Sequence, residues 1–164
     1  MPLPFTDQAD DDLDACVEMM RGGSKTFFAA SRFLPPRVRS ASIALYAFCR
    51  VADDMVDQGG VIEDSLRVLH HRLDLMYAGT PMDTVEDRAL CIVVHRHALP
   101  RHLLDALLDG FAWDGHGRQY ETMEDLHGYA ARVAGSVGAM MCWIMGPQQA
   151  STLARACELG VAMQ

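Results

Sequence analysis

The sequence of 164 residues lacks several features that would each define a class of protein. Its most apolar window, residues 133 to 145, is shorter than the roughly 20 residues that a membrane-spanning helix needs. The N-terminal stretch MPLPFTDQADDDLDAC has neither a basic region nor an apolar core, so we expect no signal peptide. Positive charge is also scarce. The 14 Lys and Arg are outnumbered by 22 Asp and Glu, and the net charge of -8 argues against a nucleic-acid partner.

Cysteine pairs are missing as well. The five cysteines are odd in number, scattered, and never spaced as CxxC; they are Cys16, Cys49, Cys91, Cys142 and Cys157. In apolar helical surroundings a cysteine behaves as a small hydrophobic residue. We therefore predict a reducing, cytoplasmic location and no disulfide framework.

Patterns typical of β-strands are absent too, and the periodic stretches are rich in the helix-forming residues Ala, Leu, Met and Arg. Half of the residues are apolar, as in a globular protein with its own core. Short breaks separate the periodic stretches: RGGS at 21–24, LPPR at 34–37, DQGG at 57–60, YAGTPMD at 77–83 and GP at 146–147. The sequence therefore predicts one all-α domain over residues 1–164, built as a bundle of roughly eight helices.

Several residues predict where these helices begin and end. Ser24 is placed to cap the second helix, Pro36 to open the third, and Thr122 with Asp125 to form a cap pair before a helix that runs to Met145. The last helix begins at Gln148 and has none of the residues that usually end a helix. We therefore expect the sequence to be the N-terminal portion of a longer domain.

Carboxylates are concentrated in LYAFCRVADDMVD, residues 45 to 57. On a helix, Tyr46, Arg50, Asp53 and Asp57 share one stripe, and Asp54 lies at its edge. Two interpretations are open: a solvated acidic face, or a site for Mg²⁺ and diphosphate. Mg²⁺ takes one or two carboxylates and completes its shell with water and phosphate, and an adjacent tyrosine suits a cleft better than open water. A calcium loop is disfavoured, because the acids lie within a helix.

Small residues are concentrated in YAARVAGSVGAMM, residues 129 to 141, inside a predicted helix. Glycine costs about 1 kcal/mol relative to alanine in such a position. Either the small residues let another helix approach closely, or they open space for a long apolar ligand lined by methionines. The sequence pattern leaves both interpretations open.

Four segments carry a resemblance to a known family. GSKTFFAASRFLPPRVR, ALYAFCRVADDMVD, GRQYETMEDLHGYAARVAGSVGAMM and ACELGVAMQ resemble the N-terminal half of bacterial members of the squalene/phytoene synthase family. The likeness covers the chain from about Asp14 onward. It implies an all-α isoprenoid-synthase-type helical bundle and a prenyltransferase. Such an enzyme joins two prenyl diphosphates head to head through a cyclopropyl diphosphate intermediate.

The same resemblance implies roles for particular residues. Asp53, Asp54 and Asp57 match the first aspartate-rich motif, which holds Mg²⁺ (with Mn²⁺ as an alternative ion) against the diphosphate, and Arg50 joins them as a catalytic residue. The implied substrate-binding residues are Tyr46, Thr26, Phe27, Tyr129, Val133, Gly138 and Gln164.

Three functional alternatives follow. The resemblance favours condensation of two geranylgeranyl diphosphates in carotenoid biosynthesis. A related enzyme that uses farnesyl diphosphate to make squalene, dehydrosqualene or hydroxysqualene is the second. A non-catalytic helical protein of the same fold is the third, because the family's second aspartate-rich motif would begin just after Gln164. The apolar substrate and product also predict peripheral contact with the inner membrane.

Overall fold

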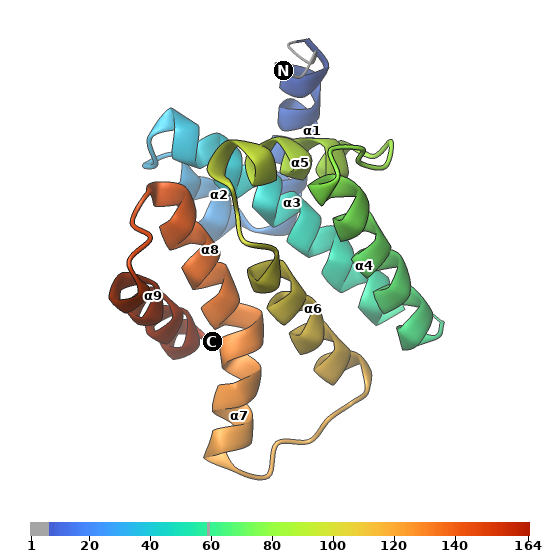
Figure 1. The fold of residues 1–164 in the computed structure, drawn as a ribbon, viewed down its shortest axis with the longest axis vertical. Coiled ribbons are helices and arrows are strands. Elements are labelled where there is room, and N and C mark those ends of the chain that lie inside the picture. The colour runs from blue at the N-terminus through green and yellow to red at the C-terminus, as the bar shows by residue number, and fades with distance from the viewer. Residues whose placement is uncertain (1–6, 59) are drawn as a thin grey trace. The chain divides into compact units, whose positions relative to one another are not determined.

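The computed structural model describes residues 7–58 and 60–164, and within these the regular structure is entirely helical (Figure 1). The elements are α1 (Asp7–Gly23), α2 (Lys25–Ser31), α3 (Pro36–Gln58), α4 (Ile62–Tyr77), α5 (Val85–His97), α6 (Arg101–Gly115), α7 (Met123–Ala130), the π-helical turn η1 (Ala131–Gly135), α8 (Ser136–Met145) and α9 (Ala150–Met163). The all-α prediction is confirmed. Residues 1–6, at the start of the stretch for which we expect no signal peptide, and Gly59 of the DQGG break lie outside the described residues. Among the helices described, none has the length and apolarity to cross a membrane.

The predicted helix starts are confirmed at three positions. The Ser24 side chain accepts a hydrogen bond from the Phe27 backbone N–H at 3.3 Å, and Thr122 accepts one from the Asp125 N–H at 3.0 Å. Both bonds satisfy backbone donors that a helix N-terminus leaves without an intrahelical partner. Pro36 opens α3, where its missing N–H costs no hydrogen bond.

The helix expected from Met123 to Met145 is confirmed, and one turn within it, η1 between α7 and α8, is π-helical. Within this turn the Ser136 hydroxyl donates to the Arg132 carbonyl oxygen at 2.5 Å. Beyond α8, Gly146 adopts φ 117°, a backbone conformation open to glycine. The last helix then begins at Ala150, two residues later than expected.

Backbone contacts divide the chain into two compact units, each built from two segments. The first unit contains the residues up to Val51 and Arg72–Ala98, and the second contains Ala52–His71 and Leu99–Gln164. Helix α3 runs from the first unit into the second. The single domain predicted from the sequence stays a prediction.

In the first unit α1 packs against α5 and α2 around an apolar core. Fully buried members of this core are Ile43, Phe48, Leu73, Met76 and Leu90. The core also holds a buried charge cluster in which Arg72 donates hydrogen bonds to Asp87 and Glu86. The Arg72 guanidinium lies 5.7 Å from the centre of the Phe48 ring, so the ring also covers the guanidinium.

In the second unit α9 lies very close to η1 and α8. A side chain at Gly138 would overlap the Ala156 carbonyl oxygen, and one at Gly160 would overlap that of Ala134. A methyl group at Gly135 would lie 2.5 Å from the Cys157 sulfur. Of the two interpretations of the small residues at 129–141, close approach of a helix is the one confirmed at Gly135 and Gly138.

Candidate functional site

The predicted acidic stripe occupies the last two turns of α3. Asp53 and Asp54 are half-buried and Asp57 is exposed, while Ala52 and Val56 on the opposite side of the helix are buried. This pattern orients the helix and leaves the carboxylates on its accessible side. Asp53 and Asp57 lie one turn apart, so both side chains project along the same face.

The carboxyl end of α3 is held by neighbours from the second unit. The Ser65 hydroxyl donates a hydrogen bond to the Met55 carbonyl oxygen at 3.1 Å, which ties α4 to this turn. A methyl group at Gly115 would lie 2.9 Å from Val56 Cγ1 and 3.1 Å from Ile62 Cδ1. Helix α6 therefore ends directly against the turn that carries the acids, because glycine leaves room for it.

Tyr129 lies near these acids. Its hydroxyl donates a hydrogen bond to an Asp114 carboxylate oxygen, and its ring centre lies 4.9 Å from that of Tyr120. The pKa of Tyr129 is raised well above its usual value, first by burial, then by the Asp114 hydrogen bond, and further by the charges of Asp114 and Asp53. The predicted residues Tyr129 and Asp53 are thus within electrostatic reach of each other. The phenol keeps its proton at neutral pH.

An aromatic and basic cluster fixes the chain around Tyr129. The Trp113 ring has two guanidinium groups against it, Arg118 at 3.8 Å and Arg132 at 4.2 Å from the ring centre. Arg132 also donates to the Gly128 carbonyl oxygen at 2.8 Å, and the ring centres of Trp113 and Tyr120 are 6.3 Å apart. These contacts connect the end of α6, the connection that follows it, and α7 with η1. Cation–π pairs contribute about 0.5 to 2 kcal/mol each.

Three further predicted residues lie in the first unit. The Phe27 and Tyr46 rings meet edge to face, with centres 6.0 Å apart and planes at 84°. The Thr26 hydroxyl lies 3.2 Å from that of Ser24. The Tyr46 hydroxyl fills the space beside Gly23 where any side chain would stand. Gly23, the second glycine of the RGGS break, is therefore needed for this contact.

The remaining predicted residues are placed by backbone contacts in the second unit. A methyl group added to Gly110 would lie 2.6 Å from Val133 Cγ1, so Val133 packs directly on the backbone of α6. A side chain added at Gly138 would point into α9, and Gln164 is exposed after the end of α9. The substrate-binding roles of these three residues stay predictions.

The donor set suits a magnesium ion that is shared with a ligand. Within residues 7–58 and 60–164, no three His, Cys, Asp or Glu side chains form a group able to hold a metal ion. Mg²⁺ prefers oxygen ligands and commonly uses one or two carboxylates, with water and phosphate oxygens in its other positions. Asp53 and Asp57, one turn apart and accessible, fit that role.

Asp114 is the functional candidate that the sequence analysis missed. It lies fifteen residues before Tyr129 in the sequence. The contact depends on how α6 and α7 meet, so no local spacing could indicate it. The only hint in the sequence is that this acid directly follows an aromatic residue, Trp113.

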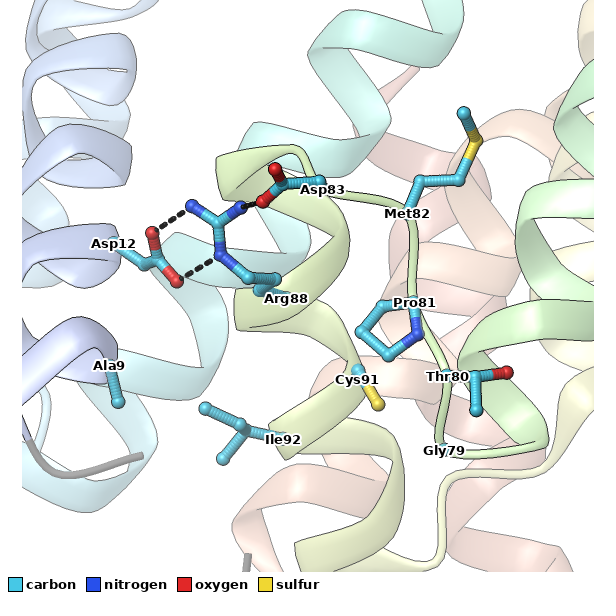
Figure 2. Close-up of a pocket in the computed structure, with 10 residues that line it drawn as sticks. All are labelled: Ala9, Asp12, Gly79, Thr80, Pro81, Met82, Asp83, Arg88, Cys91 and Ile92. Carbon is cyan, nitrogen blue, oxygen red and sulfur yellow. Dashed lines mark hydrogen bonds and ion pairs between the residues drawn. The ribbon is translucent and has the colours of Figure 1, made fainter. Parts of the chain in front are cut away.

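A cavity of about 250 Å³ lies elsewhere, within the first unit, and Figure 2 shows its lining. At one edge Arg88 bridges two carboxylates: its guanidinium donates to Asp12 at 2.6 and 2.8 Å and to Asp83 at 2.5 Å. Cys91, on the same helix as Arg88, donates its S–H to the Met76 carbonyl oxygen, and burial raises its pKa. The polar groups on this wall thus already have partners within the protein.

The fold and the acidic helix together define an all-α protein of the isoprenoid-synthase type. The family model for squalene/phytoene synthase matches residues 20–164, and the chain belongs to this family. Two curated relatives are 52% identical to it: a phytoene synthase from Rhodobacter capsulatus over 159 residues, and one from Cereibacter sphaeroides over 166 residues. Each match covers 95% of this chain and 47% of the relative, so the chain spans about half the length of these relatives.

Solved structures agree with this assignment. A dehydrosqualene synthase crystallised with a ligand superposes with a TM-score of 0.87 at 32% identity, over 96% of this chain and 55% of that one. A squalene synthase from Alicyclobacillus acidocaldarius superposes with a TM-score of 0.89 at 26% identity, over 98% and 61%. The predicted isoprenoid-synthase fold is confirmed.

Proposed function

We propose that this chain belongs to a prenyltransferase that joins two geranylgeranyl diphosphates head to head, through a cyclopropyl diphosphate intermediate, in carotenoid biosynthesis. The observation that carries the proposal is the 52% identity with two bacterial phytoene synthases over 95% of the chain. The two solved relatives, named for dehydrosqualene and squalene synthesis, are only 32% and 26% identical. Farnesyl diphosphate is the second candidate substrate, for a reaction of the squalene or dehydrosqualene type.

We assign the diphosphate end of the substrate to the acidic stripe of α3. Asp53, Asp54 and Asp57 would hold Mg²⁺ or Mn²⁺, with Arg50 one turn earlier on the same helix as a direct contact for phosphate oxygens. The bound metal would offset the negative charge of the departing diphosphate. The protein supplies no nucleophile in this proposal, since the reacting groups all belong to the substrates.

Tyr129 provides a neutral aromatic wall in the same proposal. Its raised pKa keeps the hydroxyl protonated, and the hydrogen bond to Asp114 fixes the ring beside Asp53. A neutral ring face stabilises a nearby cation through its quadrupole, and a protonated phenol is a poor nucleophile towards an allylic cation. Val133, Gly138, Gln164, Thr26, Phe27 and Tyr46 are proposed as further substrate-binding residues.

Product analysis by mass spectrometry tests the proposal. The prenyltransferase to which this chain belongs is incubated with geranylgeranyl or farnesyl diphosphate, with Mg²⁺ or with a chelator. Phytoene formed only with Mg²⁺ and the longer diphosphate is the expected result. A squalene-type product from farnesyl diphosphate would assign the second candidate function instead. Folded chain that binds neither diphosphate would contradict both.

Contact with a membrane also belongs to the proposed function. Both the prenyl chains of the substrate and the hydrocarbon product are poorly soluble in water, so delivery and release at a bilayer surface are favourable. We propose peripheral rather than spanning contact, as the amphipathic surface of a soluble domain would provide.

A further inference from the structure

The charges of this acidic protein are unevenly distributed along the sequence. Between residues 19 and 52 there is no Asp or Glu, although the chain as a whole has 22 of them. The same interval contains six Lys and Arg of the total of 14. A cationic stretch therefore interrupts a protein whose net charge is -8.

Four of the cations from the first unit lack acidic partners. Within the described residues no ion pair involves Lys25, Arg32, Arg37 or Arg96, and all four side chains are exposed. Most other arginines differ: Arg72 and Arg88, in the same unit, are each bound by two acids. These unpaired charges would be strongly hydrated unless an anionic partner covers them.

An exposed apolar residue lies among these cations. Phe33 is 89% exposed, in the turn that joins α2 to α3. This turn has a defined shape, because the Phe33 N–H donates to the Ala30 carbonyl oxygen at 3.1 Å and the Leu34 N–H to that of Ser31 at 3.1 Å. The exposed Pro35 and Pro36 follow, so FLPP at 33–36 presents a short apolar edge with Arg32 before it and Arg37 after it.

Helix α5 adds to the same positive region. Its acids, Glu86 and Asp87, lie in its first turn and are turned towards Arg72, whereas Arg96 lies in its last turn. The pKa of His97 is lowered by burial and then by the charges of Arg96 and Arg37, which places both arginines near this histidine. We name Arg32, Phe33, Arg37 and Arg96 the basic face.

We propose that the basic face binds the surface of an anionic lipid bilayer, with Phe33 inserted between headgroups and the arginines paired with lipid phosphates. An aromatic side chain flanked by arginines matches the boundary between acyl chains and anionic headgroups. The flanking residues Leu34, Pro35 and Pro36 carry no side-chain donors or acceptors that could read nucleic-acid bases. The inference gives a location to the membrane contact proposed above, and its test needs no catalysis.

Vesicle cosedimentation measures this binding on the intact chain. One set of vesicles is phosphatidylcholine alone, and the other is phosphatidylcholine with an equal amount of phosphatidylglycerol. Binding is expected only to the anionic set and is expected to weaken as salt is raised. Each positive charge near such a surface contributes about fivefold to partitioning, so R32Q with R37Q should weaken binding by on the order of thirtyfold.

Matched variants separate this surface from general charge effects. R67Q with R155Q removes the same charge from exposed positions of the second unit and should leave binding within about twofold, because charge away from the bilayer is screened. Phe33→Ser should weaken binding by about tenfold without changing the melting temperature, because the ring contacts little protein.

Three results would overturn the proposal. The first is no binding to anionic vesicles by a chain that circular dichroism shows to be folded. The second is binding that weakens equally in R32Q with R37Q and in R67Q with R155Q, which would indicate that net charge alone drives the binding. The third is binding that is unchanged in Phe33→Ser, which would exclude insertion. Because no diphosphate or metal is used, these results are independent of the proposed catalytic function.

Discussion

Removing Asp87 should destabilise the first unit more than removing any surface acid. Its carboxylate is fully buried and accepts hydrogen bonds from Arg72 Nε at 2.9 Å and Nη2 at 2.6 Å. In Asp87→Ala the Arg72 guanidinium stays buried and keeps its hydrogen bond to Glu86, but loses the bonds to Asp87. Breaking one partner out of a buried pair costs about 3 to 5 kcal/mol, since it leaves a charge without compensation in a medium of low polarity.

Thermal unfolding followed by circular dichroism measures this loss. For a chain of this length each kcal/mol moves the melting temperature by about 2 to 4 °C, so Asp87→Ala should lower it by on the order of 10 °C. Asp64→Ala is the matched control. The pair of Asp64 with Arg67 is 65% and 75% exposed, and such surface pairs contribute about 1 kcal/mol or less.

A second variant tests the cause of the effect. Arg72→Met combined with Asp87→Leu and Glu86→Leu removes all three charges of the cluster and fills the site with apolar groups, and it should recover most of the stability. If Asp87→Ala melts within the range of Asp64→Ala, the buried charge cluster does not hold the unit together. If the triple variant is as unstable as Asp87→Ala, the loss is due to packing rather than to an uncompensated charge.

Three further changes have defined outcomes. Gly160→Val should destabilise the second unit by several kcal/mol in urea unfolding, because its side chain would overlap backbone of η1 (Ala131–Gly135). The Arg88 hydrogen bonds lower the pKa of Asp12, so the stability lost in Asp12→Asn should be largest above the usual aspartate pKa of 3.8 and should vanish as pH falls through the lower folded value. Asp114→Asn should lower the pKa of Tyr129 in an ultraviolet titration, because the carboxylate favours the protonated phenol.

Each of these changes has a control. The control for Gly160→Val is Gly22→Ala. Gly22 is helical and no atom lies within 4 Å of an added methyl group, so this change should be neutral or slightly stabilising. Asp10→Asn alters an exposed carboxylate on the same helix as Asp12 and should have little effect on stability. Asp125→Asn removes a carboxylate bonded to Arg118 and should leave the Tyr129 titration unchanged. If a variant has no effect, or if its control has the same effect, the contact that the variant tests is refuted.

The features that sequence predicted best are those set by neighbouring residues. Ser24, Pro36 and Thr122 act on the backbone within one turn, so their positions alone indicate where helices begin. The acidic stripe of α3 (Pro36–Gln58) follows from helical periodicity in the same way, and buried Ala52 and Val56 mark its opposite side.

The features that sequence could not predict depend on contacts between distant residues. Arg72 and Asp87 are fifteen residues apart and on different helices, and either could have been a surface charge. The glycines of η1 and α8 fitted either a ligand or a helix until Ala156 and Gly160 were placed against them. The partner of Tyr129 was hidden for the same reason. The composition of the chain limits which contacts between distant residues can form, but the packing of the whole chain decides which of them do form.

Binding of geranylgeranyl diphosphate, measured by calorimetry with and without Mg²⁺, tests the central claim most directly. The account predicts Mg²⁺-dependent binding to the wild-type chain that is lost in Asp53→Asn with Asp57→Asn. The same binding should persist in Asp10→Asn with Asp64→Asn, which removes two exposed carboxylates elsewhere. If the variant of Asp53 and Asp57 folds and binds as the wild type does, the acidic stripe is a solvated surface and not a diphosphate site.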